Sequence, residues 1–110
     1  MTIATADRVR SLVDDFGGQA EVARALGVNR SRVTRWLRDE SPDPSNRRKL
    51  EAVEFALSRL SQTFGRETAV SWLYGLNAHI GDRRPIDLLA AGRVSEVLAA
   101  IEAEETGAFA

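Results

Sequence analysis

The sequence predicts an all-α protein, and three observations support this. Apolar residues recur every three or four positions along most of the chain, which is the period of an amphipathic helix. No strand-sized window alternates between apolar and polar residues. Glycine and proline fall between the periodic segments rather than inside them, so they mark helix ends and loops. The 110 residues, 44% of them hydrophobic, are enough for one compact unit, or a small unit with an appendage.

Composition excludes several classes of protein and site. The chain has no cysteine, which rules out a disulfide scaffold, a thiolate zinc site and a cysteine nucleophile. A single histidine leaves no histidine-rich metal site and few routes to acid–base catalysis. No apolar run exceeds five residues, so a membrane span is not expected, and no secretory signal is recognisable. We expect a cytoplasmic protein without a metal or cofactor.

Three short helices are expected in the first 38 residues. Gly17 and Gly18 end the first, and its apolar stripe consists of Val9, Leu12, Val13 and Phe16. The second covers about 19–26 and ends at Gly27. Asn29 is a suitable N-cap for the third, which runs to about Arg38 and turns Val33, Trp36 and Leu37 inward.

A proline-rich loop at 41–45 separates these helices from a longer one over about 45–60. The apolar residues of this longer helix cover more than one stripe, so a second surface must bury those outside the first stripe. Two interpretations remain open: it forms a dimer contact, or it packs against the second half of the same chain.

The apolar pattern of the second half predicts three more helices. The first covers about 66–76 and a turn-rich segment follows at 77–84. Pro85 suits the first position of the next helix, which stops near Gly92. The last helix carries Val94, Val97, Leu98 and Ile101 on one face to about Glu105, and residues 106–110 form a tail.

Residues 19–37 fit a helix-turn-helix. Two short helices that meet at a steep angle need a small residue at their contact, a glycine in the turn and apolar anchors. Ala23 and Gly27 meet the first two needs, and Val33 and Trp36 anchor the third helix. This spacing resembles that of repressor-type DNA-binding proteins.

Charge supports a nucleic-acid face in the first half. Residues 1–60 hold 11 basic and 9 acidic side chains, residues 61–110 hold 4 and 7, and Arg24 to Lys49 alone have a net charge of +5. Arginine can bond guanine bidentately, asparagine suits adenine, and serine or threonine serves bases or phosphates. The predicted DNA-binding residues are Gln19, Asn29, Arg30, Ser31, Arg32, Thr34, Arg35 and Arg38.

Within this set, the residues expected to contact the edges of DNA bases are Arg30, Ser31, Thr34 and Arg35. Gln19 is assigned to a phosphate, and the cluster 47–49 could follow the adjoining DNA backbone. The competing interpretation is that an arginine-rich helix is an ordinary solvated face. Proteins of this type usually dimerise on two half-sites.

The second half shows no catalytic site. Trp72 lies on an apolar face, which favours core packing, and His79 lacks a nucleophile partner, which favours a structural hydrogen bond. Residues 82–84 are most simply a solvated turn. No phosphate-binding loop, carboxylate pair or metal-ligand spacing occurs, so an enzyme is the least favoured class.

A series of residues in the second half nevertheless follows a known pattern: Ala69, Trp72, Leu73, Asn77, the segment 81–89, Gly92, Val94, Val97 and Gly107. This pattern resembles the toxin-binding domain of Xre/MbcA/ParS antitoxins, which follows a helix-turn-helix and ends the chain. The resemblance covers about residues 9–110. The chain departs from the pattern at Leu76, where the family often has proline, and at Asp82, where a second glycine is common.

The resemblance implies a helix-turn-helix domain over 1–60 and a toxin-binding domain over 61–110. It also implies a partner, an NAD-degrading toxin with a RES domain that the antitoxin blocks by direct contact, together with repression of the operon. The antitoxin would be a homodimer or a hetero-oligomer with toxin, without a small-molecule substrate. The implied toxin-binding residues are Arg83, Arg84, Glu104, Glu105, Thr106, Gly107, Ala108, Phe109 and Ala110.

The acidic end of the chain could fill a cleft that is cationic because it binds the pyrophosphate of NAD, with Phe109 as an apolar anchor. The competing interpretation is a frayed terminus. Two other functions stay open: a plain transcription regulator whose second half only dimerises, and an interaction module that no longer binds DNA.

Overall fold

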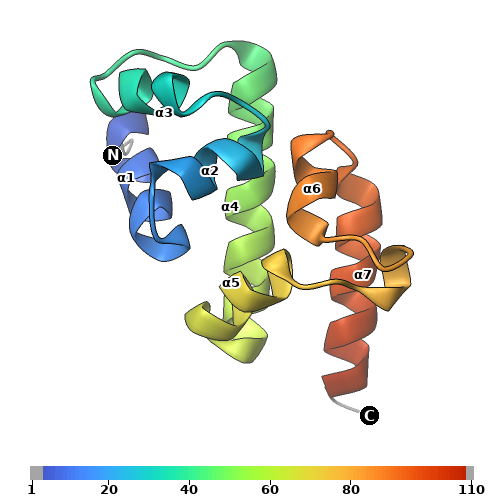
Figure 1. Cartoon of the computed structure of the whole chain (residues 1–110). Helices are drawn as coiled ribbons and strands as arrows, with labels where there is room; N and C mark the ends of the chain where they lie inside the picture. The colour runs from blue at the N-terminus through green and yellow to red at the C-terminus, as the bar shows by residue number, and fades with distance from the viewer. Residues whose placement is uncertain (1–3, 109–110) are drawn as a thin grey trace.

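A computed structural model describes residues 4–108 and confirms the all-α fold (Figure 1). Helices alone form its regular structure over this range, apart from an isolated bridge between Asn77 and Arg83. None of these helices is both long and apolar enough to cross a bilayer. In chain order the elements are α1 (Thr5–Phe16), α2 (Gln19–Leu26), α3 (Arg30–Leu37), α4 (Pro44–Phe64), α5 (Arg66–Tyr74), the 3-10 helix η1 (Ala78–Ile80), α6 (Pro85–Ala90) and α7 (Val94–Ala108).

The long helix α4 stands in the middle of the molecule. In Figure 1, α1, α2 and α3 lie on one side of α4, and α6 and α7 lie on the other. α5 packs against the C-terminal end of α4 and leads the chain across to α6 and α7. One hydrophobic cluster contains buried residues from both sides, including Trp36 from α3 and Ile101 from α7. The two halves are therefore joined by a shared core.

Of the two interpretations of the long helix, packing within the chain is confirmed. Leu50, Val53, Ala56, Leu57 and Leu60 are each at most 1% exposed, and α4 contacts α2, α5, α6 and α7. A boundary between residues 60 and 61 would fall inside α4. Domains 1–60 and 61–110 remain a prediction about the division of function between surfaces.

The turn between α2 and α3 requires its glycine for two reasons. Gly27 has a φ of +67°, where residues with a side chain are strained, and its amide closes the end of α2. A Cβ at this position would also lie 3.1 Å from the carbonyl oxygen of Ala90, at the end of α6. The same glycine thus lets the chain turn and lets the second half approach that turn.

Helix boundaries or caps differ from the prediction at four places. α4 continues to Phe64, four residues past Leu60, and Gly65 with a φ of +83° ends it. α5 stops at Tyr74 rather than residue 76. Asn29 occupies the N-cap position of α3 with extended backbone, but its side chain makes no capping bond.

The fourth difference concerns the expected tail. Residues 106–108 continue α7, where the Thr106 hydroxyl donates to the carbonyl of Glu102 at 2.9 Å. A tail beginning at residue 106 is therefore wrong. The glycine at 107 weakens a helix only locally, because the preceding turns are already fixed by packing of Val97 and Ile101. Phe109 and Ala110 lie outside the described residues.

A shared core predicts that the two halves unfold together. Trp36 reports on the first half and Trp72 on the second, so the variants Trp36→Phe and Trp72→Phe each leave one fluorescent probe. We expect coincident denaturant midpoints when each variant is monitored by fluorescence and by circular dichroism. Adding Leu57→Ala should lower the free energy of unfolding by about 2–5 kcal/mol in both backgrounds. Two separate transitions in either variant would contradict a single core.

Candidate binding surfaces

The outer face of α3 gathers most of the predicted DNA-binding residues. Val33 and Trp36 are buried, which fixes the rotation of α3 against α1 and α2. The exposed side of α3 and its start consists of Asn29, Arg30, Ser31, Arg32, Arg35 and Arg38. The structure therefore brings these six residues onto one basic surface, the α3 face.

Gln19 and Thr34 act differently from the other members of the predicted set. Both are only partly exposed, and the Thr34 hydroxyl donates to Oε1 of Gln19 at 2.7 Å. This bond links the start of α2 to the middle of α3. Its physical effect is to hold the two helices at a fixed angle, so a contact with DNA would use these side chains as a joined pair.

Two arginines of the α3 face have acidic neighbours. Arg35 lies 3.2 Å from Glu40, and Arg32 lies 3.7 Å from Asp43. The side-chain amide of Asn46 also donates to Asp43, which lowers the pKa of that carboxyl below its ordinary value. Exposed pairs of this kind contribute little to the free energy of folding. Within residues 4–108, Arg30 and Arg38 form no ion pair.

A polar cleft of about 490 Å³ extends the α3 face toward the start of α4. Arg32 and Lys49 line it from opposite helices, together with Asn29 and Ser45. Arg47 and Arg48 are exposed beside it. The cluster 47–49 therefore lies next to the α3 face, as a contact with an adjoining DNA backbone would require.

The acidic residues near the end of α7 are engaged within the chain. Glu104 accepts a hydrogen bond from the indole N–H of Trp72 at 3.1 Å. Glu105 accepts a bidentate bond from Arg59 on α4, with the closest atoms 2.6 Å apart, and this raises the pKa of the arginine above its ordinary value. Trp72 is half-buried against the core, as predicted, but its polar edge has this additional role. These side chains fasten α7, and the following Thr106 and Gly107 are exposed.

Residues 82–84, before α6, are exposed as a solvated turn predicts, but two of them also bond within the chain. Arg83 donates to the carbonyl of Ile80 at 2.8 Å, and Arg84 donates to the carbonyl of Tyr74 at 3.0 Å. Asn77 is only 9% exposed, and its side-chain oxygen accepts from the backbone N–H of His79 at 2.9 Å. The structural hydrogen bond predicted for the His79 side chain stays a prediction, because this bond involves only the backbone of that residue. Arg83 also lies 3.4 Å from Glu96, near the start of α7. Glu104 and Glu105 lie near the opposite end of that helix. The predicted toxin-binding residues thus form two patches.

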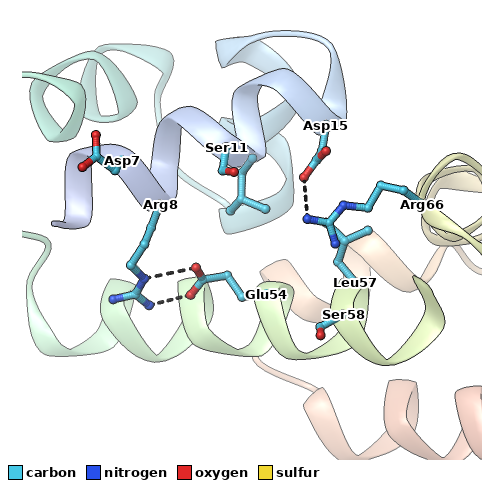
Figure 2. A pocket seen from close by; sticks show the side chains of 9 residues that line it. Asp7, Arg8, Ser11, Asp15, Glu54, Leu57, Ser58 and Arg66 are labelled. Carbon is cyan, nitrogen blue, oxygen red and sulfur yellow. Dashed lines mark hydrogen bonds and ion pairs between the residues drawn. The ribbon is translucent and has the colours of Figure 1, made fainter. Parts of the chain in front are cut away.

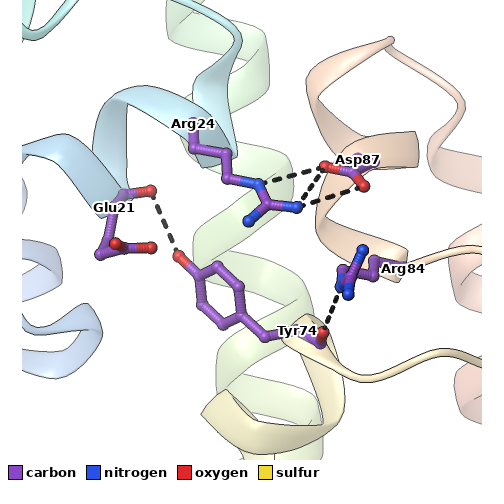
Figure 3. A network of polar contacts seen from close by, with 5 residues as sticks. All are labelled: Glu21, Arg24, Tyr74, Arg84 and Asp87. Atoms are coloured by element: carbon purple, nitrogen blue, oxygen red, sulfur yellow. Dashed lines mark hydrogen bonds and ion pairs between the residues drawn. The ribbon is translucent and has the colours of Figure 1, made fainter.

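A polar network ties α2 to the second half (Figure 3). The Tyr74 hydroxyl donates to the carbonyl of Glu21 at 3.2 Å, and its ring lies 6.0 Å from the guanidinium of Arg24. Arg24 in turn lies 3.4 Å from Asp87 on α6. Burial of the phenol disfavours its charged form and raises the pKa of Tyr74 to about 12. Sequence reasoning missed these partners because they are 53 and 63 residues apart.

The joint between α1, α4 and α5 contains two further ion pairs beside a groove of about 290 Å³ (Figure 2). Arg8 on α1 makes a bidentate contact with Glu54 on α4, which raises the pKa of Arg8. Asp15 lies 3.1 Å from Arg66 of α5. No cluster of three or more potential metal ligands occurs among residues 4–108. The groove residues mainly fasten helices to one another.

The sequence and the fold resemble those of known antitoxins. No family model matches the chain. The mycobacterial cidal antitoxin MbcA of Mycobacterium tuberculosis and that of Mycobacterium bovis are each 28% identical to it over 90 residues, which is 81% of this chain and 80% of theirs. A chain in the crystal structure of the M. tuberculosis MbcT-MbcA toxin-antitoxin complex superposes with a TM-score of 0.75 and 25% identity, covering 96% of this chain and 97% of that one.

The chain is thus similar in sequence and in fold to MbcA antitoxins. The resemblance found in the second half of the sequence is thereby confirmed. The structural match extends over both halves, so the helices that carry the α3 face belong to the antitoxin fold as much as those near the C-terminus.

The buried phenol in the antitoxin gives a pH prediction. Tyr74 is the only tyrosine, so the ultraviolet absorbance of phenolate follows it alone. We expect a midpoint of about 12 in the folded protein and near 10 in denaturant. The pKa of Tyr74 is higher in the folded protein than in the unfolded chain, so the neutral phenol stabilises the fold. This stabilisation is complete below pH 10 and is lost as the pH rises from 10 through 12. Tyr74→Phe should lose less stability over this interval, and a folded-state midpoint near 10 would contradict the buried phenol.

Proposed function

We propose that this antitoxin neutralises a cognate toxin by direct binding. The observation that carries the proposal is the match of nearly the whole chain, at a TM-score of 0.75, to a protein from a toxin-antitoxin complex. We further propose that the toxin is the RES-domain, NAD-degrading enzyme that the sequence pattern implies. In this proposal the antitoxin acts in the cytoplasm as a stoichiometric binder, without chemistry of its own.

The end of α7 is the proposed element that occludes the toxin. Glu104 and Glu105 hold the last turns of the helix against Trp72 and Arg59. The segment 106–110 follows directly and carries Phe109. A cleft that binds the pyrophosphate of NAD needs positive charge, so an acidic helix end that is held in one direction complements it. Positioning by the two glutamates reduces the ordering cost on binding.

Deletion of residues 106–110 tests the occlusion. We expect the truncated antitoxin to stay folded, because its described core residues end at Ile101, and to lose neutralisation in cells that co-express the neighbouring toxin gene. Cell growth and total NAD are the measurements. Arg93→Ala, which removes an exposed pair with Glu96, is a control that should neutralise normally. Full protection by the truncated form would contradict occlusion by the chain end.

We also propose that the α3 face binds operator DNA and that the antitoxin thereby represses its own operon. The α3 face presents four exposed arginines, three on α3 and Arg38 just after it, and a helix with such a surface suits the major groove. In this proposal Arg30, Ser31, Thr34 and Arg35 contact base edges, and the bond between Thr34 and Gln19 holds Thr34 in position. The cluster 47–49 and Gln19 supply the contacts to phosphates. Two half-sites would be read by a homodimer.

Alanine substitution on α3 tests the DNA proposal. Arg30→Ala should weaken operator binding by about 1–3 kcal/mol and relax sequence preference, because a bidentate contact to guanine would be lost. Lys49→Ala should weaken binding to all sequences and lower the salt dependence by about one unit. Arg66→Ala, at the start of α5 and away from the α3 face, is the matched control. Fluorescence anisotropy with duplex DNA at several salt concentrations makes the measurement, and equal loss for Arg30→Ala and Arg66→Ala would contradict the assignment.

A further inference from the structure

The polar cleft beside the α3 face does not end at the start of α4. A second groove, of about 230 Å³, continues from it and shares Ser45 and Lys49 as lining residues. Arg48 lines this second groove from α4, and Gly92 and Val94 line it from the turn between α6 and α7. We call the two grooves together the α4 track. It connects the turn between α2 and α3 with the second half of the chain.

Packing of the second half against the turn between α2 and α3 creates the α4 track. At Gly27 the main chain comes so close to α6 that an added Cβ would lie 3.1 Å from the carbonyl oxygen of Ala90. The end of α6 is thereby held beside this turn. In Figure 1 the start of α4 lies between α3 and the turn from α6 to α7. One continuous surface therefore includes α3, the start of α4 and that second turn.

The α4 track is lined by cations and not by carboxylates. Arg32, Arg48 and Lys49 line it, and within residues 4–108 no acidic side chain does. Two other grooves, at the joint of α1, α4 and α5 and between α4 and α7, both include carboxylates. Arg48 and Lys49 form no ion pair in the part of the chain that the structure describes. The nearby Glu96, in the first turn of α7, is already paired with two arginines.

An extended polyanion is the ligand that such a track fits. Each strand of duplex DNA carries one phosphate per ~3.4 Å of helix axis, so a strand that meets the α3 face has further phosphates beyond it. Gly92 has no side chain, and a Cβ there would meet no neighbouring atom within 4 Å. The wall formed by the second half thus leaves the approach to Arg48 and Lys49 open. Contacts of these cations with phosphates would position the protein on DNA without reading its sequence.

We infer that the DNA-binding surface of this protein extends along the α4 track into the second half of the chain. The phosphates of one strand bind Arg48 and Lys49, and the turn between α6 and α7 lies against the same strand. The inference rests on the proposed binding of DNA by the α3 face. It also changes the division of function between residues 1–60 and 61–110, because the second half then contacts DNA as well as toxin.

The charge at position 92 tests the inference. Gly92 has a φ of +80°, which asparagine and aspartate tolerate better than other residues with a side chain, so Gly92→Asp and Gly92→Asn differ mainly in charge. We expect Gly92→Asp to bind duplex DNA about three- to tenfold more weakly than Gly92→Asn at low salt, because its carboxylate repels the phosphates. The difference should shrink as the salt concentration rises. Fluorescence anisotropy with a labelled duplex of mixed sequence makes the measurement, because phosphate contacts do not depend on sequence.

Thr68→Asp is the matched control for an added negative charge. Thr68 is exposed on α5, which packs against the opposite end of α4 from the track. This variant should bind the duplex as the natural chain does. Circular dichroism checks that all three variants fold. Equal affinity of Gly92→Asp and Gly92→Asn, or an equal loss for Thr68→Asp, overturns the inference.

Failure of this inference and failure of the proposed DNA binding give different results. If Lys49→Ala weakens binding while the two Gly92 variants bind equally, the α3 face keeps its role and the second half does not reach DNA. A natural chain that binds no duplex DNA overturns both. A Gly92→Asp variant that binds DNA normally but no longer neutralises the toxin, measured by cell growth and total NAD, assigns the second groove to the toxin and overturns the inference alone.

Discussion

The burial of α4 on three of its sides is the constraint on which the rest of this structure depends. Leu50, Val53, Leu57 and Leu60 are nearly inaccessible to solvent, and they meet α2, α5, α6 and α7 at once. Burying aliphatic side chains of this size contributes about 1.5–3 kcal/mol each relative to exposure. A chain of 110 residues has room for one such core, so its first and second halves cannot be packed independently.

Sharing one core has a consequence for function. The turn between α2 and α3 touches the end of α6 at Gly27, and Tyr74 links α2 to α5 through Glu21 and Arg24. The α3 face and the end of α7 are therefore fixed relative to one another by packing and by hydrogen bonds. Binding at one surface could alter the other only through a change in this core, since no flexible linker separates them within residues 4–108.

Polar contacts set the direction of the elements that project from the core. Arg59 and Glu105 join α4 to the last turns of α7, Trp72 holds Glu104, and Arg83 and Arg84 bond to backbone carbonyls of the preceding loop. Each is a half-exposed interaction worth little alone. Together they remove freedom from the segments proposed to meet a toxin, and a binding element that is already ordered loses less entropy on association.

Local sequence signals were enough to predict the helices and the positions of the two candidate surfaces in outline. The hydrophobic period and the positions of glycine and proline located α1, α2, α3 and α6 to within a few residues, because these signals act locally. The basic character of α3 also followed from sequence, since Val33 and Trp36 identify its inward side and leave the arginines outside. The pattern from Trp72 to Gly107 was sufficient to indicate the antitoxin family.

The tertiary structure alone decided how far α4 and α7 extend, which side chains are free to bind and which hold the fold together. Helix ends that lack a strong stop signal are set by what packs against them, as at Phe64 and Ala108. Nothing in the sequence indicates that the charges of Glu104, Glu105, Arg83 and Arg84 have partners. Only folding brings those partners near. Ion pairs and hydrogen bonds between residues 46 or 63 positions apart leave no periodic trace in a sequence, because three-dimensional proximity alone creates them.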